Sequence, residues 1–304
     1  MQVAKQYINI ANYQVDEPLI LENGDILRDL RIQYSTYGEL NQDRSNVVWV
    51  FHALTANCEV IDWWEGLVGE NDFINPKEHF IICANMLGSC YGSTEPLGFE
   101  FPLITIRDMV KAHKFLKNHL RIDKIKMGIG GSMGGQQLLQ WAVEEPDLFE
   151  NIVPIATNAK HSAWGIAFNE AQRMALANTD PEKGLEAARA IALLSYRNYR
   201  TYEATQSDED ERIDDFSASS YQLYQGQKLA KRFSPFSYYY LLKAMDSHHL
   251  GRYFNGIEAA LSRINSKAVV IGVDTDILFP IEEQTFIAEH IKNSTVHIIS
   301  SVYG

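Results

Sequence analysis

Lys124-Ile-Lys-Met-Gly-Ile-Gly-Gly-Ser132-Met-Gly-Gly135 is the stretch that decides the fold. Its first half is apolar at alternate positions, as in a strand, and residues 136–145 have the pattern of a helix. A serine in a Gly-x-Ser-x-Gly turn between strand and helix sits on a tight corner, which needs residues without side chains on both sides. The corner lifts the hydroxyl above the sheet, close to the N–H groups that begin the helix. The stretch therefore predicts a nucleophile at Ser132.

Three further apolar runs read as buried strands, namely Asn46–Phe51, Phe80–Ala84 and Ile152–Thr157, and Ile104–His119 has apolar residues near helical spacing. Residues 7–35 alternate in short apolar and polar pieces, which predicts an antiparallel hairpin or meander that opens the sheet. Because strands and helices then alternate, we expect an α/β fold with a mostly parallel sheet and helices on both faces.

The alternation stops between about Ser162 and Tyr253, where we find helical patterns around a charged link at Gln206–Asp215. A helical insertion between two strands of such a sheet predicts a lid over the strand ends. The alternative is a structural subdomain or a dimer surface, and the same insertion can be a lid and have this second role as well. The sheet resumes at Lys267–Gly272 and continues at Thr295–Ser300. The expected organisation is a first core part, a helical lid and a second core part, at residues 1–161, 162–255 and 256–304.

Composition and charge exclude several classes of function. The 304 residues carry a formal net charge of −12 without a basic block, which argues against nucleic acid or an anionic membrane as partner. No apolar run approaches the length of a membrane span, and the N-terminus lacks the apolar region of a secretion signal. Three cysteines without metal-like spacing fit a reducing compartment. We expect a cytoplasmic protein without a metal site.

A serine hydroxyl needs a base within hydrogen-bond reach and an acid that orients the base. In a strand–turn–helix serine enzyme these follow the nucleophile in the order acid, histidine. Asp276 is the best acid, since it lies on the loop after the buried strand Lys267–Gly272; Asp274 is its rival, with turn formation as its simpler role. The loop after Asn46–Phe51 is where a second oxyanion N–H group is expected.

The histidine should follow the strand Thr295–Ser300, and none of the nine histidines stands there. We expect His297 to pack in the sheet, His52 to be structural, and His161, His248 and His249 to lie in or beside the lid. The remaining four are expected to be ordinary surface residues: His79, His113, His119 and His290.

Several segments together resemble the homoserine O-acetyltransferase family of the α/β-hydrolase superfamily. The resemblance spans nearly the whole chain in the right order, which makes it far more specific than the serine turn alone. The segments are His52-Ala-Leu-Thr55, Asp62-Trp-Trp-Glu-Gly-Leu-Val-Gly69, Cys90-Tyr-Gly-Ser-Thr94, Thr105-Ile-Arg-Asp-Met-Val110, Gly130-Gly-Ser-Met-Gly-Gly135, His161-Ser-Ala-Trp164, Asn169-Glu-Ala-Gln-Arg173 and Asp274-Thr-Asp-Ile-Leu-Phe-Pro280.

The resemblance implies acetyl transfer from acetyl-CoA, as a co-substrate and not a bound cofactor, to the hydroxyl of L-homoserine in methionine biosynthesis. Ser132 would carry the acyl group by a ping-pong route, Asp276 would be the acid, and the N–H groups of Leu54 and Met133 would hold the oxyanion. Arg173 matches an arginine that grips the substrate carboxylate, a task suited to a planar guanidinium; a salt bridge within the lid is its simpler role. We also expect a homodimer formed through the lid.

Two departures from the family pattern bear on these expectations. In the family, His-Asp follows a Tyr-Gly that corresponds to Tyr303-Gly304, so we expect the base in a longer chain and impaired activity in this one. The stretches after Thr94 and after Pro181 are also shorter than usual, which leaves the acyl group and the acceptor open. The alternatives are succinyl transfer, a serine acceptor, a plain esterase, or a binding protein without catalysis.

Overall fold

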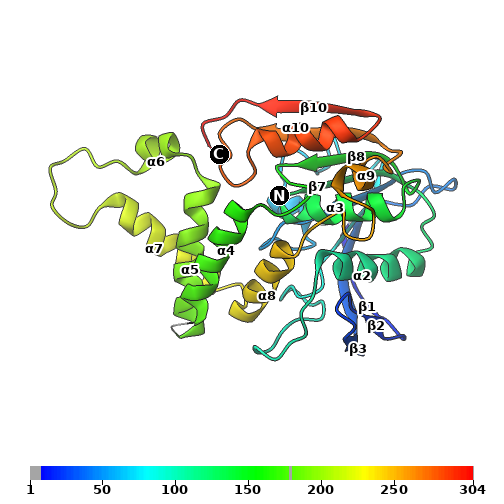
Figure 1. Cartoon of the computed structure of the whole chain (residues 1–304), viewed down its shortest axis with the longest axis horizontal. Coiled ribbons are helices and arrows are strands. Elements are labelled where there is room, and N and C mark those ends of the chain that lie inside the picture. Colours follow the sequence, from blue (N-terminus) through cyan, green and yellow to red (C-terminus); the bar gives the residue numbers. More distant parts are fainter. Residues whose placement is uncertain (1–7, 178–179, 304) are drawn as a thin grey trace.

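Figure 1 shows a core built on one sheet and a group of helices that projects from it. The structure is a computed structural model that describes residues 8–177 and 180–303. Its main sheet has the strand order β1-β4-β6-β5-β7-β8-β9-β10. The strands are β1 (Ile8–Gln14), β4 (Arg31–Tyr37), β5 (Val47–Phe51), β6 (Phe80–Ala84), β7 (Ile125–Gly131), β8 (Phe149–Ile155), β9 (Lys267–Val273) and β10 (Ser294–Ile299).

The sheet is mostly parallel, as the alternating sequence predicts. Strand β4 is antiparallel to both β1 and β6, and the strands from β6 through β5, β7, β8 and β9 to β10 run parallel. Between β1 and β4 the chain forms a small ribbon of β2 (Leu19–Ile20) and β3 (Ile26–Leu27). The expected antiparallel opening of the sheet is therefore confirmed.

Helices α2 (Ile106–His119), α3 (Met133–Glu144) and α10 (Ile281–His290) belong to the core. Gly128 of β7 lies against α3 and Gly272 of β9 lies against α10, and the strand register puts these two glycines on the same face. The opposite face of β5 and β6 is covered by residues 58–74, which include α1 (Val60–Trp63). Helical segments thus lie on both faces. Beyond α1, the second face of β7, β8 and β9 borders an apolar groove of about 750 Å³.

The insertion consists of helices that leave the sheet after β8 and return before β9. They are α4 (Ala163–Ala177), α5 (Pro181–Tyr196), α6 (Tyr199–Gln206), α7 (Ser217–Ala230) and α8 (Pro235–Asp246), and α9 (Ile257–Leu261) leads back to the sheet. In Figure 1, α6, α7 and the loop between them project farthest from the core. Helix α5 ends at Tyr196 and α6 begins at Tyr199 as a separate helix. The Asn198 side chain caps α6 by accepting from the Arg200 N–H.

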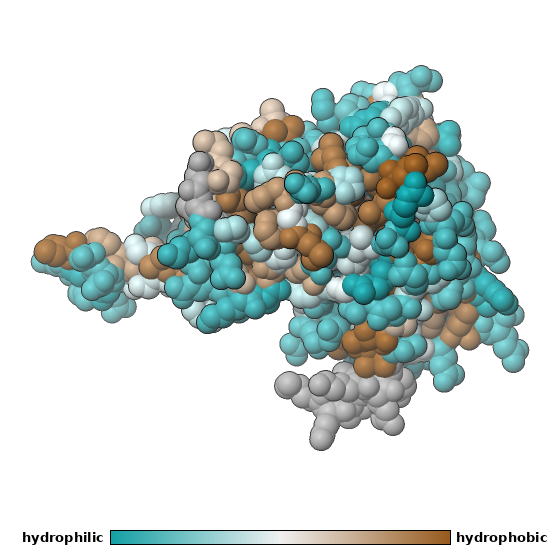
Figure 2. Space-filling view, turned by 90° about the horizontal axis from the view of Figure 1, so that it is seen from below, coloured by the Kyte–Doolittle hydropathy of each residue, from teal (hydrophilic) through white to brown (hydrophobic). Residues whose placement is uncertain are grey.

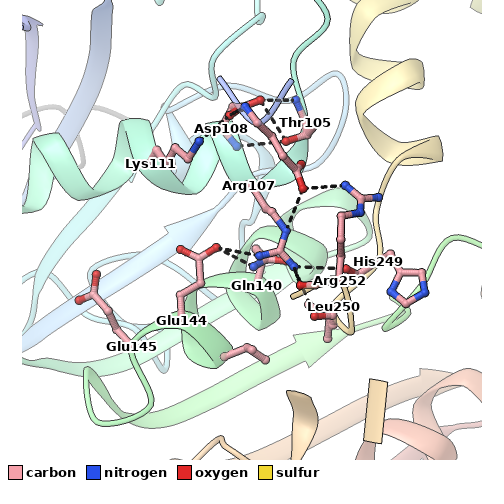
Figure 3. Close-up of polar contacts among 12 residues, drawn as sticks. Thr105, Arg107, Asp108, Lys111, Gln140, Glu144, Glu145, His249, Leu250 and Arg252 are labelled. Atoms are coloured by element: carbon pink, nitrogen blue, oxygen red, sulfur yellow. Dashed lines mark hydrogen bonds and ion pairs between the residues drawn. The ribbon is translucent and has the colours of Figure 1, made fainter. Parts of the chain in front are cut away.

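The segment Thr105–Val110 has a structural role at the start of α2. Thr105 and Asp108 form a reciprocal capping box, which satisfies N–H groups at the helix N-terminus. Arg107, a buried side chain in the same turn of α2, pairs with Glu144 of α3, and its Nη2 donates to the carbonyls of Leu250 and Arg252 (3.3 and 2.7 Å; Figure 3). Arg107 therefore ties the returning end of the insertion to two core helices.

Candidate active site

Ser132 stands at the corner between β7 and α3, in a backbone conformation that a serine rarely adopts (φ 53°, ψ −124°). The corner is this tight because two glycines let the backbones approach. A Cβ on Gly130 would lie 2.6 Å from Gly134, and a Cβ on Gly134 would lie 2.2 Å from the carbonyl oxygen of Phe51. The turn predicted from Gly-x-Ser-x-Gly is thus present, and its glycines are required by packing.

The backbone N–H and the backbone carbonyl of Ser132 are both hydrogen-bonded. Its N–H donates to the Ile155 carbonyl (2.9 Å), and its carbonyl accepts from the Gln136 N–H (3.1 Å) and the Thr157 hydroxyl (2.8 Å). Among the described residues, no side chain is hydrogen-bonded to the Ser132 hydroxyl. The strained residue is therefore fixed through its backbone, while its side-chain hydroxyl stays available.

Two backbone N–H groups near the corner have the features of an oxyanion hole. Met133 is the first residue of α3, so its N–H has no partner within the helix and lies at the positive end of the helix dipole. Within residues 8–177 and 180–303, neither this N–H nor that of Leu54 donates to a backbone carbonyl. Both side chains are buried. Their role as oxyanion donors stays a prediction.

The loop that carries Leu54 is organised by His52, which is buried. The His52 Nε2 accepts from the Met86 N–H (3.1 Å), so the proton is on Nδ1, which lies 2.9 Å from the Ala53 carbonyl. Burial lowers the pKa of His52 to about 4. A neutral ring with both nitrogens engaged holds the loop and is not a base for Ser132.

The two candidate acids differ in their surroundings. Asp274 is exposed and accepts from the Ser300 hydroxyl and the Ser301 N–H (2.7 and 3.0 Å); these bonds lower its pKa. Asp276 is half-buried, and its Oδ1 accepts from the N–H groups of Leu278 and Phe279 at 2.8 Å each. Burial raises the Asp276 pKa against the opposing effect of these two bonds. Asp274 thus shapes the turn after β10, while Asp276 has a second oxygen to orient a partner.

None of the nine histidines, all of which the structure describes, is hydrogen-bonded to Ser132 or Asp276. His161 contacts Asn169 (3.1 Å), and the His248 ring contacts the Asn158 carbonyl (3.0 Å). Burial lowers the pKa of His161 to about 4 and that of His248 to about 3. No histidine that the structure describes is therefore placed as the base.

Two of the predictions made for histidines were wrong. His113 is buried, not at the surface: its Nε2 contacts the Gln137 carboxamide oxygen (2.9 Å) and its ring stacks on Trp141. His297 lies in β10 as predicted but is exposed, because β10 is the edge strand and has a neighbour on one side only. Periodicity located both residues in the right element and could not decide which elements would cover them.

Arg173 lies on α4 and is already neutralised by two carboxylates. Its guanidinium contacts Glu170 (2.5 Å) and Asp246 of α8 (2.6 Å). It lines an open pocket of about 600 Å³, whose lining includes neither Ser132 nor Asp276. The structure therefore does not bring Arg173 together with the nucleophile in one pocket, and its substrate role stays a prediction.

Arg189 of α5 is a further arginine of the insertion, which sequence reasoning did not consider. Its guanidinium lies 5.5 Å from the ring centre of Tyr196, and it has no carboxylate partner in the described part of the chain. The Tyr196 pKa is raised by burial. The available signal was an arginine within the otherwise apolar run Ala187–Leu194. A guanidinium without a carboxylate partner can accept one, so Arg189 joins Arg173 as a candidate for the substrate carboxylate, and the described contacts join neither of them to Ser132.

The described residues show neither a metal cluster nor a membrane-spanning helix. No group of three or more acidic, cysteine or histidine side chains among them could hold a metal ion. None of the helices over residues 8–177 and 180–303 is long and apolar enough to cross a bilayer.

Comparison with solved structures supports the fold. A crystal structure of homoserine O-acetyltransferase from Staphylococcus aureus superimposes with a TM-score of 0.85 at 27% identity, over 97% of this chain and 89% of that one. The crystal structure of esterase E22 gives a TM-score of 0.89 at 19% identity, over 98% and 94% of the two chains. At that identity the second likeness shows the fold alone.

Comparison of sequences identifies the family. The family model described as alpha/beta hydrolase fold matches residues 46–303. A homoserine O-acetyltransferase from Cyclobacterium marinum is 48% identical over 311 residues, covering 96% of this chain and 89% of the relative. One from Chlorobaculum parvum is 40% identical over 316 residues, covering 97% and 89%. The chain therefore belongs to the homoserine O-acetyltransferase family of alpha/beta hydrolases, a family of acyltransferases.

Proposed function

We propose that the protein transfers an acetyl group from acetyl-CoA to the side-chain hydroxyl of L-homoserine, as a step of methionine biosynthesis in the cytoplasm. The observation that carries this proposal is the strained corner at Ser132, which leaves the hydroxyl without a side-chain partner among the described residues, in a chain 48% identical to a homoserine O-acetyltransferase. A nucleophile of this kind stores the acyl group between two half-reactions, so that donor and acceptor can bind in turn.

In the first half-reaction the Ser132 oxygen attacks the thioester carbonyl, and its proton passes to a general base, a role that none of the histidines in the described residues is placed to fill. The tetrahedral oxygen would be held by the N–H groups of Met133 and Leu54. The C–S bond then breaks, and CoA leaves with the proton. In the second half-reaction the homoserine hydroxyl attacks the acyl-enzyme, and the Ser132 oxygen takes back a proton as the product ester leaves. Asp276 would orient the base throughout, through its free carboxylate oxygen.

Intact-mass measurement tests the covalent step. Incubation with acetyl-CoA should add one acetyl group to the protein, and Ser132→Ala should remove the adduct without loss of folding. Homoserine should discharge the adduct and accelerate CoA release many-fold over water. An adduct that water alone discharges would favour the plain esterase, and no adduct at all would favour the binding protein. Succinyl-CoA and serine in parallel reactions decide between the related donors and acceptors.

The carboxylate of homoserine has two candidate receptors, Arg173 and Arg189. Arg173→Met and Arg189→Met are matched variants, each removing one guanidinium from the insertion. The variant that removes the true receptor should raise the homoserine KM about 100-fold, since a charge-assisted pair is worth about 3 kcal/mol. It should leave acylation by acetyl-CoA unchanged. Equal, small effects of both variants would remove both residues from the acceptor site.

The projecting insertion supports a homodimer. Its arm, comprising α6, α7 and the loop between them, exposes apolar side chains that include Tyr199, Ile213 and Leu223, and Figure 2 shows apolar surface at the end of this projection. Exposed patches of this kind mark interfaces. Sedimentation at several concentrations should give a dimer, and Leu223→Asp should shift it towards a monomer.

A further inference from the structure

We infer that Arg232 is a positioning residue for the oxyanion loop, defined here as residues 52–57. Arg232 belongs to the α7–α8 turn, residues 231–234, which joins the last two long helices of the insertion. Its Nη1 donates to the Thr55 carbonyl (2.7 Å) and to the Tyr91 hydroxyl (2.6 Å). The insertion thus reaches the loop that carries the N–H of Leu54.

A contact at the Thr55 carbonyl can fix the direction of the Leu54 N–H, because the two residues belong to one turn. The Ala56 N–H donates to the Ala53 carbonyl (3.1 Å), so residues 53–56 form a turn with Leu54 and Thr55 at its two central positions. The Ala53 end of the turn is held by His52. Arg232 holds the Thr55 carbonyl, which belongs to the peptide that joins this central position to Ala56. The peptides on either side of the Leu54–Thr55 pair are thus both anchored, which sets the direction of the Leu54 N–H, and without Arg232 one of these anchors is lost.

The second partner of Arg232 is itself bonded to the core. The Tyr91 carbonyl accepts from the side-chain amide of Asn85 (2.5 Å), whose Oδ1 accepts from the Cys58 N–H just after the oxyanion loop (2.8 Å). The Tyr91 ring also packs edge-on against the buried Phe233 of the α7–α8 turn, with ring centres 5.7 Å apart. Arg232 therefore closes a ring of contacts among three segments that are distant in sequence.

This position predicts a particular kinetic effect. Both half-reactions build negative charge on an oxygen that meets the same N–H groups, so a misdirected Leu54 N–H slows acylation and deacylation by the same factor. The oxyanion contact with this N–H strengthens only in the transition state and does not add to the binding of either substrate in the ground state. KM values therefore stay unchanged. Removing an oxyanion donor outright costs about 100- to 1,000-fold; a donor left in place but loosened should cost about tenfold.

The test compares Arg232→Met with Lys231→Met. Lys231 is the adjacent exposed cation, and its side chain has no hydrogen bond or ion pair within the described residues, so this control removes the same charge. Two rates are measured: the burst of p-nitrophenol from p-nitrophenyl acetate, which reports acylation without an acceptor, and transfer from acetyl-CoA to homoserine. We expect Arg232→Met to lower both about tenfold at unchanged KM, and Lys231→Met to lower neither.

Two further variants keep the test decisive if Arg232→Met folds poorly. Arg232→Lys should restore most of the rate, because an ammonium can still donate to the Thr55 carbonyl. Tyr91→Phe should cost less than Arg232→Met, since the Thr55 contact remains. An acylation burst in Arg232→Met equal to that of Lys231→Met would overturn the inference, as would a loss confined to homoserine transfer.

The inference rests on the proposed acyl-enzyme and on Leu54 as a donor, but it can fail separately. If the wild-type protein is acylated at Ser132 and homoserine does not accelerate turnover, the proposed acceptor is wrong, and the burst comparison still decides the role of Arg232. If homoserine accelerates turnover and the burst does not depend on Arg232, the function stands and the positioning role falls.

Discussion

The corner at Ser132 shows how single glycines determine the geometry of the site. Gly134 lies so close to the Phe51 carbonyl that a methyl group there would overlap backbone atoms, whereas a Cβ on Gly131 would lie 3.7 Å from its nearest neighbour, in ordinary contact. We expect Gly134→Ala to lower the free energy of unfolding by about 3 kcal/mol or to prevent folding, and Gly131→Ala to cost under about 1 kcal/mol. Urea unfolding of the two variants checks this, and equal losses would contradict it.

Asp276 and Asp274 are the second residue-scale contrast. Asp276→Asn should lower kcat by about four orders of magnitude, as loss of an orienting acid does in other serine enzymes. Asp274→Asn should retain most of the rate, because its oxygens hold the Ser300–Ser301 turn rather than a base. Acylation rates of both variants decide the assignment, and a larger loss at Asp274 would reverse it.

At the scale of elements, buried and exposed ion pairs on α2 should differ in energy. Arg107 and Lys114 both pair with Glu144, but the Arg107 side chain is 9% exposed and that of Lys114 is 27% exposed. Arg107→Met removes a buried ion pair and the donor to the Leu250 and Arg252 carbonyls, so we expect a loss of about 3–5 kcal/mol in unfolding free energy. Lys114→Met should cost about 1 kcal/mol or less. Thermal and urea unfolding measure both, and similar losses would argue against a structural role for Arg107.

At the scale of the whole molecule, buried neutral histidines should make stability depend on pH. Burial lowers the pKa of His52, His113 and His161 to about 4 and that of His248 to about 3, below the ordinary 6.5. Between about pH 6.5 and 4 the unfolded chain therefore binds more protons than the folded one, and stability is lost as the pH falls through this window.

Each such histidine contributes a slope of up to about 1.4 kcal/mol per pH unit in that window. We expect the unfolding free energy to change little from pH 8 to 7 and to fall steeply from pH 6 to 5. His113→Gln should make this slope shallower by about one proton, whatever it does to the absolute stability. Urea unfolding at each pH measures the slope, and a flat profile down to pH 5 would show that these rings are protonated in the folded state.

The sequence by itself determined the fold and the tight turn at Ser132. Apolar runs of strand length, helical spacing and the glycines around Ser132 are local patterns, and each has one structural solution when the next element agrees with it. The order of these elements along the chain predicted the parallel sheet and the helical insertion, and the family motifs led to the same family as the comparisons.

Only the tertiary structure decided what covers each side chain. It buried His113 under Trp141, exposed His297 on an edge strand, neutralised Arg173 with Asp246, and left Arg189 without a carboxylate. It also brought the Arg232 side chain into contact with Thr55, which lies 177 positions earlier in the chain. Periodicity reports which face of an element is apolar; the partner of a polar side chain depends on contacts between distant segments, which no local pattern carries.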